Sequence, residues 1–225
     1  MLNFFRTRYP ALILYLVSSV LTIIGLIFEL DYLVFLAKPI IAPSIIYYYL
    51  QIVNLKFDWL FLIAVLTSFI SDMFVLVDNG ISIVVILLNL FVYFIFINFL
   101  LKDFFESKIS LKNSHEFLII LLCFFFLLFL IMDLFHNLDR SMYYIYTFYG
   151  IILSFLSAIA VYLNLKSQNN RTLNGLLMSI CFILSDIFYV LYHYQIKIEI
   201  FLVINLIAQI FSYYYMIGYI ISKKA

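Results

Sequence analysis

The segment FILSDIF, residues 182–188, places a carboxylate inside an apolar helix. An earlier segment, FISDMF at residues 69–74, has the same arrangement, with Ser before Asp and apolar residues on both sides. A charged side chain at the centre of a membrane helix costs roughly 2.5–3.5 kcal/mol on insertion scales, so such residues face the interior of a bundle and find partners there. Asp72 and Asp186 are therefore the leading candidates for a functional site, and the other helices are expected to bring them together.

Composition indicates the class of protein. The 225 residues are 67% hydrophobic and only 11% charged, whereas about 25% of an ordinary soluble domain is charged. An all-α bundle of membrane-spanning helices in a lipid bilayer is predicted. The net charge of +1 gives no electrostatic reason to bind nucleic acid. Cys123 and Cys181 belong to no CxxC motif or Cys/His cluster, so neither a metal site nor a cofactor is expected.

Segments long enough to span a membrane cover most of the chain, since a span needs about 20 mostly apolar residues. We predict a single transmembrane domain over residues 1–225 with eight spans, at 10–29, 33–51, 59–77, 81–101, 116–134, 143–164, 173–192 and 199–221. The longest predicted loop, residues 102–115, divides them into two groups of four. Because Asp72 and Asp186 lie four spans apart in similar local sequence, a parallel 4+4 repeat is a further hypothesis. The sequence does not indicate an oligomeric state.

Basic residues predict the orientation. With the N-terminus inside, ten of the 13 Lys and Arg residues fall on the inner side and only Arg140 and Lys197 on the outer side. Cytoplasmic segments carry an excess of basic residues, so both termini are expected in the cytoplasm. The expected location is a bacterial inner membrane.

Polar residues from six spans are predicted to share one layer in the outer half of the membrane. Counted from the predicted span ends, and with a helical rise of 1.5 Å per residue, they lie within about 5 Å of one another in depth. Helical spacing adds Tyr93 to the face of Asn89 and Gln209 to the face of Asn205. Lipid cannot satisfy polar groups, so this layer should face inward. Besides the two Asp residues, the candidate substrate-binding residues are Lys38, Asn89, Tyr93, Tyr149, Ser185, Asn205 and Gln209.

Other residues have both structural and functional interpretations. Pro39 and Pro43 predict a kink in span two, which would open a cavity beside the carboxylates. Lys38 is either part of the site or the cation of a structural ion pair. Tyrosines near the span ends are expected in an interfacial belt: Tyr47 to Tyr49, Tyr143, Tyr144 and Tyr213 to Tyr215.

The sequence from Lys38 to about Tyr214 resembles the YhhN family of eight-span membrane proteins, whose characterised members are lysoplasmalogenases. The resemblance rests on Lys38-Pro39, on the SxxSD motif at residues 68–72, on the Leu-Ser-Asp stretch at residues 184–186 and on Ala208-Gln209. The chain differs from the family pattern at three positions. Ser71 stands where the family usually has Gly, Asn89 where a His is usual, and Asn205 where a Tyr is expected.

The resemblance implies hydrolysis of the vinyl ether bond of a lysoplasmalogen, which gives a fatty aldehyde and a glycerophospho-alcohol. This reaction begins with proton transfer to carbon. One carboxyl must therefore be protonated, while a nearby carboxylate stabilises the cation and activates water. The expected arrangement is an Asp72–Asp186 pair sharing one proton.

Two alternatives remain open. Buried acids also suit a proton-coupled transporter or a small-molecule channel, although the apolar inner halves of the spans, such as residues 119–126, favour a one-sided pocket. Because Asn89 replaces the family His, the chain is alternatively a family member that keeps the fold without turnover.

Overall fold

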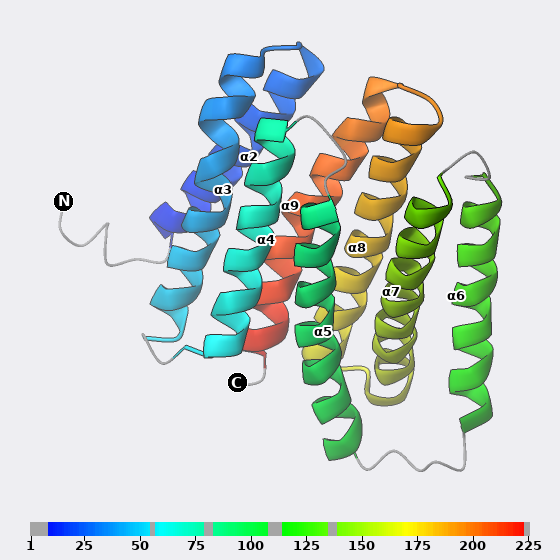
Figure 1. The fold of residues 1–225 in the computed structure, drawn as a ribbon. Coiled ribbons are helices and arrows are strands. Elements are labelled where there is room, and N and C mark those ends of the chain that lie inside the picture. Colours follow the sequence, from blue (N-terminus) through cyan, green and yellow to red (C-terminus); the bar gives the residue numbers. More distant parts are fainter. Residues whose placement is uncertain (1–8, 55–56, 79–82, 108–113, 135–138, 223–225) are drawn as a thin grey trace.

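The structure is a computed structural model, and it describes residues 9–54, 57–78, 83–107, 114–134 and 139–222. Eight helices, each long and apolar enough to cross a membrane, run up and down in one bundle (Figure 1). This confirms the predicted all-α, multi-pass membrane protein in a bilayer. The helices are α2 (Tyr9–Ile27), α3 (Asp31–Ile52), α4 (Trp59–Asp78), α5 (Ile83–Glu106), α6 (Ser114–Leu134), α7 (Arg140–Ser167), α8 (Asn170–Tyr194) and α9 (Glu199–Ile221).

Most helices extend beyond the apolar segments that predicted them. The predicted loop 102–115 is wrong at both ends, because α5 continues to Glu106 and α6 begins at Ser114. Helix α8 begins at Asn170, three residues before the predicted span. Its start is fixed by a capping box, in which the Asn169 side chain accepts from the Thr172 N–H and the Thr172 hydroxyl accepts from the Asn169 N–H. Hydropathy located the apolar part of each helix and missed these polar ends.

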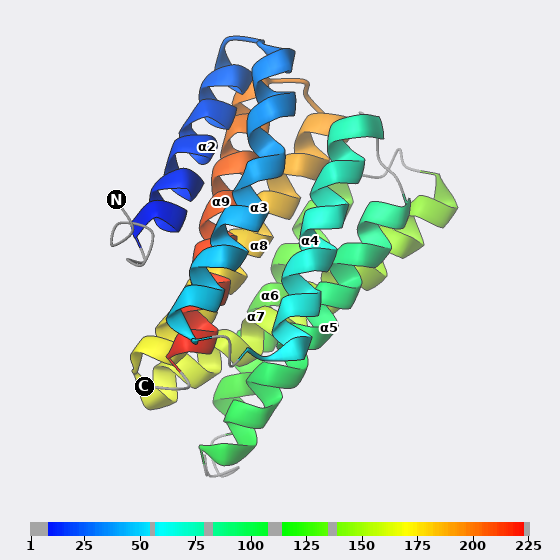
Figure 2. The same ribbon diagram turned by 90° about the vertical axis from the view of Figure 1, so that its left-hand side faces the viewer.

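Seven helices form a ring, and the eighth lies outside it. Around the ring, each of α9, α2, α3, α4, α5, α7 and α8 packs against the next, and α8 packs against α9 to close it. Helix α6 packs on α7 at the edge of the bundle, far from α2 and α3 (Figures 1 and 2). Most of α6 therefore faces lipid; Phe126 is 63% exposed. The interior of the ring is the place for a polar site.

Packing inside the ring differs between its two ends. At the end where α4 finishes at Asp78 and α9 begins at Glu199, which we call the cavity end, burial is incomplete. Helix α8 has no buried residue after Ser185, and α9 has none before Asn205. Toward the opposite end, aromatic side chains fill the interior of the helix ring. They form a column of Tyr93, Phe182, Phe96 and Tyr219, in which the centroids of successive side-chain rings are 5.0, 6.1 and 6.5 Å apart.

A paired charge cluster lies at this opposite end, which we call the ion-pair end. Arg171 of α8 donates from Nε and Nη2 to the two carboxylate oxygens of Asp103 of α5, at 2.5 and 2.6 Å. The Tyr219 hydroxyl of α9 donates to the same carboxylate at 2.5 Å, and the guanidinium lies 4.4 Å from the Tyr219 ring centroid. The two-point ion pair joins α5 to α8, and the Tyr219 hydroxyl adds α9 to the cluster. It also explains the extension of α5, since Asp103 lies in the predicted loop.

Candidate functional site

A polar cavity lies inside the ring, between α4, α5, α7, α8 and α9. Eight of the nine candidate residues line it, and Lys38 lines a smaller cavity next to it. The main cavity holds about 80 Å³, which is room for several water molecules, since one water needs roughly 10–15 Å³. Valines and isoleucines such as Val85, Ile86 and Val92 complete its walls. Five of the six residues of the predicted layer thus surround one space, and the sixth, Lys38, lines the space beside it.

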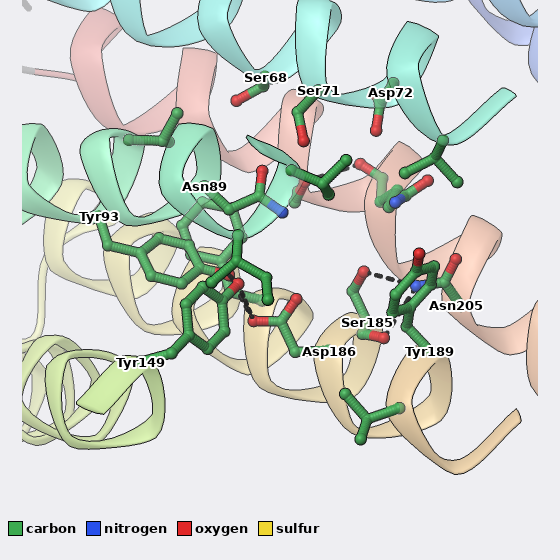
Figure 3. A pocket seen from close by; sticks show the side chains of 18 of the residues that line it. Ser68, Ser71, Asp72, Asn89, Tyr93, Tyr149, Ser185, Asp186, Tyr189 and Asn205 are labelled. Atoms are coloured by element: carbon green, nitrogen blue, oxygen red, sulfur yellow. Dashed lines mark hydrogen bonds between the residues drawn. The ribbon is translucent and has the colours of Figure 1, made fainter. Parts of the chain in front are cut away.

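Asp186 projects into the cavity from α8 and is held by two tyrosines. The hydroxyls of Tyr93 and Tyr149 donate to its Oδ2 at 2.5 and 2.7 Å, and the two hydroxyls are 2.9 Å apart. Both rings are buried, at 3% and 8% exposed. The other carboxyl oxygen, Oδ1, makes no hydrogen bond with the described residues and is turned to the cavity (Figure 3). Distances of 2.5–2.7 Å lie at the short end of the range for O–H···O hydrogen bonds, whose usual distance is about 2.7–2.8 Å.

Asp72 lies on the wall opposite Asp186, on α4, and has one hydroxyl partner among the residues that the structure describes (Figure 3). The Tyr213 hydroxyl of α9 donates to its Oδ2 at 2.6 Å. Among the residues that the structure describes, no hydrogen bond joins Asp72 to Asp186. The two carboxyls are therefore not hydrogen-bonded to each other, because each is held by tyrosines on its own wall and space remains between them. The single proton expected on the pair stays a prediction.

Lys38 and Asp72 line the smaller cavity together, and Gln209 and Tyr213 belong to both cavities. Lys38 shares this cavity with Asp72, but its ammonium makes no ion pair within 4 Å in the described part of the chain. Helix α3 continues through Pro39 and Pro43, and the Ser44 hydroxyl donates to the Ile40 carbonyl at 2.6 Å. The prolines thus leave α3 a single helix that carries a half-buried cation to the edge of the site.

The remaining candidates differ in how the protein satisfies them. The Asn205 side chain donates to the Ser185 carbonyl at 2.8 Å and to the Ser185 hydroxyl at 2.9 Å, which ties α9 to α8 beside Asp186. Asn89 and Gln209, in contrast, make no side-chain hydrogen bond with any described residue, although both line the cavity. Their amides are free to bind water or a ligand.

Sequence reasoning missed Tyr213. It was expected in an interfacial belt, yet it is 4% exposed and binds Asp72. Its signal was its spacing, because Tyr213 follows Gln209 by four residues and so shares its helical face. Tyr49, also expected in the belt, is fully buried, and its hydroxyl accepts from the Asp58 N–H at 3.0 Å. Tyr47 and Tyr144, at 56% and 64% exposed, do lie on the surface.

Tyr146 and Tyr189 also line the cavity without having been candidates. The Tyr146 hydroxyl lies 3.2 Å from that of Tyr194. Tyr189 follows Asp186 by three residues and so continues its helical face.

The arrangement has the parts that acid–base chemistry requires: two carboxyl groups from different helices, hydroxyls that fix them, and space between them for a reacting group. Comparison with known proteins gives no family to set beside this geometry, because no protein-family model, no curated protein and no solved structure matches the chain.

Proposed function

We propose that this protein is a YhhN-like intramembrane hydrolase that cleaves the vinyl ether bond of a lysoplasmalogen to a fatty aldehyde and a glycerophospho-alcohol. One observation carries the proposal: Asp72 and Asp186 face each other across a polar cavity inside an otherwise apolar ring of helices. A membrane protein keeps such costly groups where they serve a function.

The chemistry suits this pair of carboxyls. A vinyl ether is hydrolysed when an acid protonates carbon and a base accepts a proton from the attacking water. Two carboxyls on opposite walls reach the substrate from two sides, as those steps demand. The cavity of about 80 Å³ accepts only the reacting part of a lipid. The alkyl chain would lie between helices in the bilayer, and Lys38 beside Asp72 would bind the phosphate.

The proposed setting is a bacterial inner membrane with both termini in the cytoplasm. The cavity end of the ring would then face outward, and the substrate would come from the outer half of the bilayer. Incomplete burial of α8 after Ser185 and of α9 before Asn205 supports entry from that end.

Proton-coupled transport is the alternative, and the packing argues against it. A transport path must continue from the cavity to the other side of the membrane. The aromatic column closes that direction, since Phe96 and Tyr219 are both fully buried and the Arg171–Asp103 pair lies beyond them. These features favour a pocket with one entrance.

Aldehyde release from a lysoplasmalogen by the purified protein in detergent tests the proposal. Asp72→Asn and Asp186→Asn should each lower the rate by about 10²–10⁴-fold, the usual contribution of a general acid or base. Asp31→Asn, an exposed acid at the start of α3, is the matched control and should keep the wild-type rate. Gel filtration checks that all three are folded.

Two results would overturn the hydrolase. One is full activity in either folded Asp→Asn variant of the cavity. The other is a well-folded wild type that releases no aldehyde, which would make uptake assays in proteoliposomes the next measurement. The saturated alkyl-ether analogue should bind without being cleaved, because it has no double bond to protonate.

A further inference from the structure

The two carboxyl groups of the cavity differ in their hydrogen-bond donors and in the charges near them, and this difference assigns them different roles. Asp186 receives two hydroxyl donors on one oxygen, whereas Asp72 receives one. Asp72 has a cation, Lys38, in the cavity beside it, and none of the described residues that line the cavity around Asp186 is a cation. The polar groups that line the main cavity with Asp186 are tyrosines, serines, the amides of Asn89, Asn205 and Gln209, and Asp72 on the opposite wall.

Charge balance favours one ionised carboxyl. In the part of the chain that the structure describes, the lining of the two cavities contains one cation, Lys38, and two carboxyls. One carboxylate neutralises Lys38, while a second would leave a net charge in the membrane interior, which is costly. A nearby opposite charge stabilises the ionised form of a carboxyl, and Lys38 lines the smaller cavity together with Asp72. Asp72 is thus the carboxylate, and Asp186 is the carboxyl that carries a proton.

The tyrosines determine which oxygen of Asp186 holds that proton. Each carboxyl oxygen has two lone pairs. The Tyr93 and Tyr149 hydroxyls occupy both on Oδ2, at 2.5 and 2.7 Å. The single proton of Tyr149 is directed to the carboxyl rather than to Tyr93, since the carboxyl oxygen is nearer than the Tyr93 hydroxyl at 2.9 Å. The acidic proton therefore lies on Oδ1, the oxygen turned to the cavity (Figure 3).

We propose that Asp186 is the acid that protonates the substrate, that Tyr93 and Tyr149 are positioning residues that hold its proton on Oδ1, and that Asp72 is the base. This assignment rests on the proposed hydrolysis. The Oδ1 proton of Asp186 goes to the outer vinyl carbon, whose C–H bond forms from the double-bond electron pair and leaves an oxocarbenium ion. Water adds to the carbon next to oxygen and gives its proton to Asp72. The hemiacetal then returns its hydroxyl proton to Asp186, and its bond to the glyceryl oxygen breaks as that oxygen takes the proton from Asp72.

Chemical rescue by formate separates the two roles. Asp186→Ala and Asp72→Ala leave space for one formate, which replaces the missing carboxyl. The rescued rate of Asp186→Ala should be proportional to the concentration of neutral formic acid. At constant total formate, that rate should therefore fall about tenfold per pH unit between roughly pH 5 and 7. Rescue of Asp72→Ala should follow the anion and stay constant over that range. The reverse pattern overturns the assignment.

A second measurement decides the matter if formate rescues neither variant. Tyr93→Phe/Tyr149→Phe should lower kcat about 10–100-fold with KM unchanged and should raise the solvent deuterium isotope effect on kcat, because proton transfer to carbon becomes slower. Tyr213→Phe, whose partner is Asp72, is the control and should not raise it. An unchanged isotope effect in the double variant overturns the assignment. A wild type without aldehyde release would refute the hydrolysis itself, whereas an active wild type with either contrary result refutes only the roles.

Discussion

At the ion-pair end of the bundle, Arg171 and Asp103 meet at two points and Tyr219 completes the cluster. At the cavity end, tyrosine hydroxyls are the only hydrogen-bond partners of the Asp72 and Asp186 side chains among the described residues. In the first cluster each charge has its opposite in contact, and Arg171 Nη1 is its one buried side-chain N or O atom without a hydrogen bond among the described residues. In the second, the amides of Asn89 and Gln209 have no described partner. Charges that hold helices together are paired by the protein, whereas the cavity leaves polar groups free to bind a ligand.

Breaking the ion pair should have the largest effect on stability. Arg171→Met leaves Asp103 buried without its cation, and removing one partner of such a pair costs about 3–5 kcal/mol. Titration with denaturing detergent in mixed micelles would measure this loss. Lys166→Met is the matched control, because Lys166 and Glu116 also pair at 2.5 Å but Glu116 is 50% exposed, and an exposed pair contributes about 0–1 kcal/mol. Equal losses of stability in the two variants would mean that the Arg171–Asp103 pair stabilises the bundle no more than an exposed ion pair does.

Removing the Tyr213 hydroxyl should have an intermediate effect. If Asp72 is ionised, Tyr213→Phe removes a hydrogen bond to a charge, which contributes about 1.5–3 kcal/mol. The control is Tyr146→Phe, which removes a longer contact between neutral hydroxyls, 3.2 Å from Tyr194, and should cost about 0.5–1.5 kcal/mol. A Tyr213→Phe loss no greater than that of the control would show that Asp72 is neutral in the resting protein.

Asn89→Ala should have the smallest effect on stability. Asn89 has no hydrogen bond with the described residues, so its removal should change the free energy of unfolding by no more than about 0.5 kcal/mol. Asn205→Ala is the comparison, because it removes two donors to Ser185 and should cost about 1–2 kcal/mol. If Asn89→Ala lowers the free energy of unfolding as much as Asn205→Ala does, then Asn89 stabilises the fold and is not a group left free for a ligand.

The sequence by itself determined the eight helices and the polar layer. Lipid supplies no hydrogen bonds, so each apolar segment of about 20 residues must satisfy its own backbone as a helix. A polar residue in such a helix must turn inward, which is why position along each span was enough to group Asp72, Asn89, Tyr149, Asp186 and Asn205.

Only the tertiary structure decided which of these groups touch. Tyr213 and Asp72 are 141 residues apart, and Arg171 and Asp103 are 68 apart. Such contacts depend on how each helix is rotated about its axis and on which helix lies beside it. The spacing of polar residues along a helix gives neither the rotation nor the neighbour. The unequal partners of the two carboxyls follow from that packing, because α5 and α7 bring two hydroxyls to Asp186 while α9 brings one to Asp72.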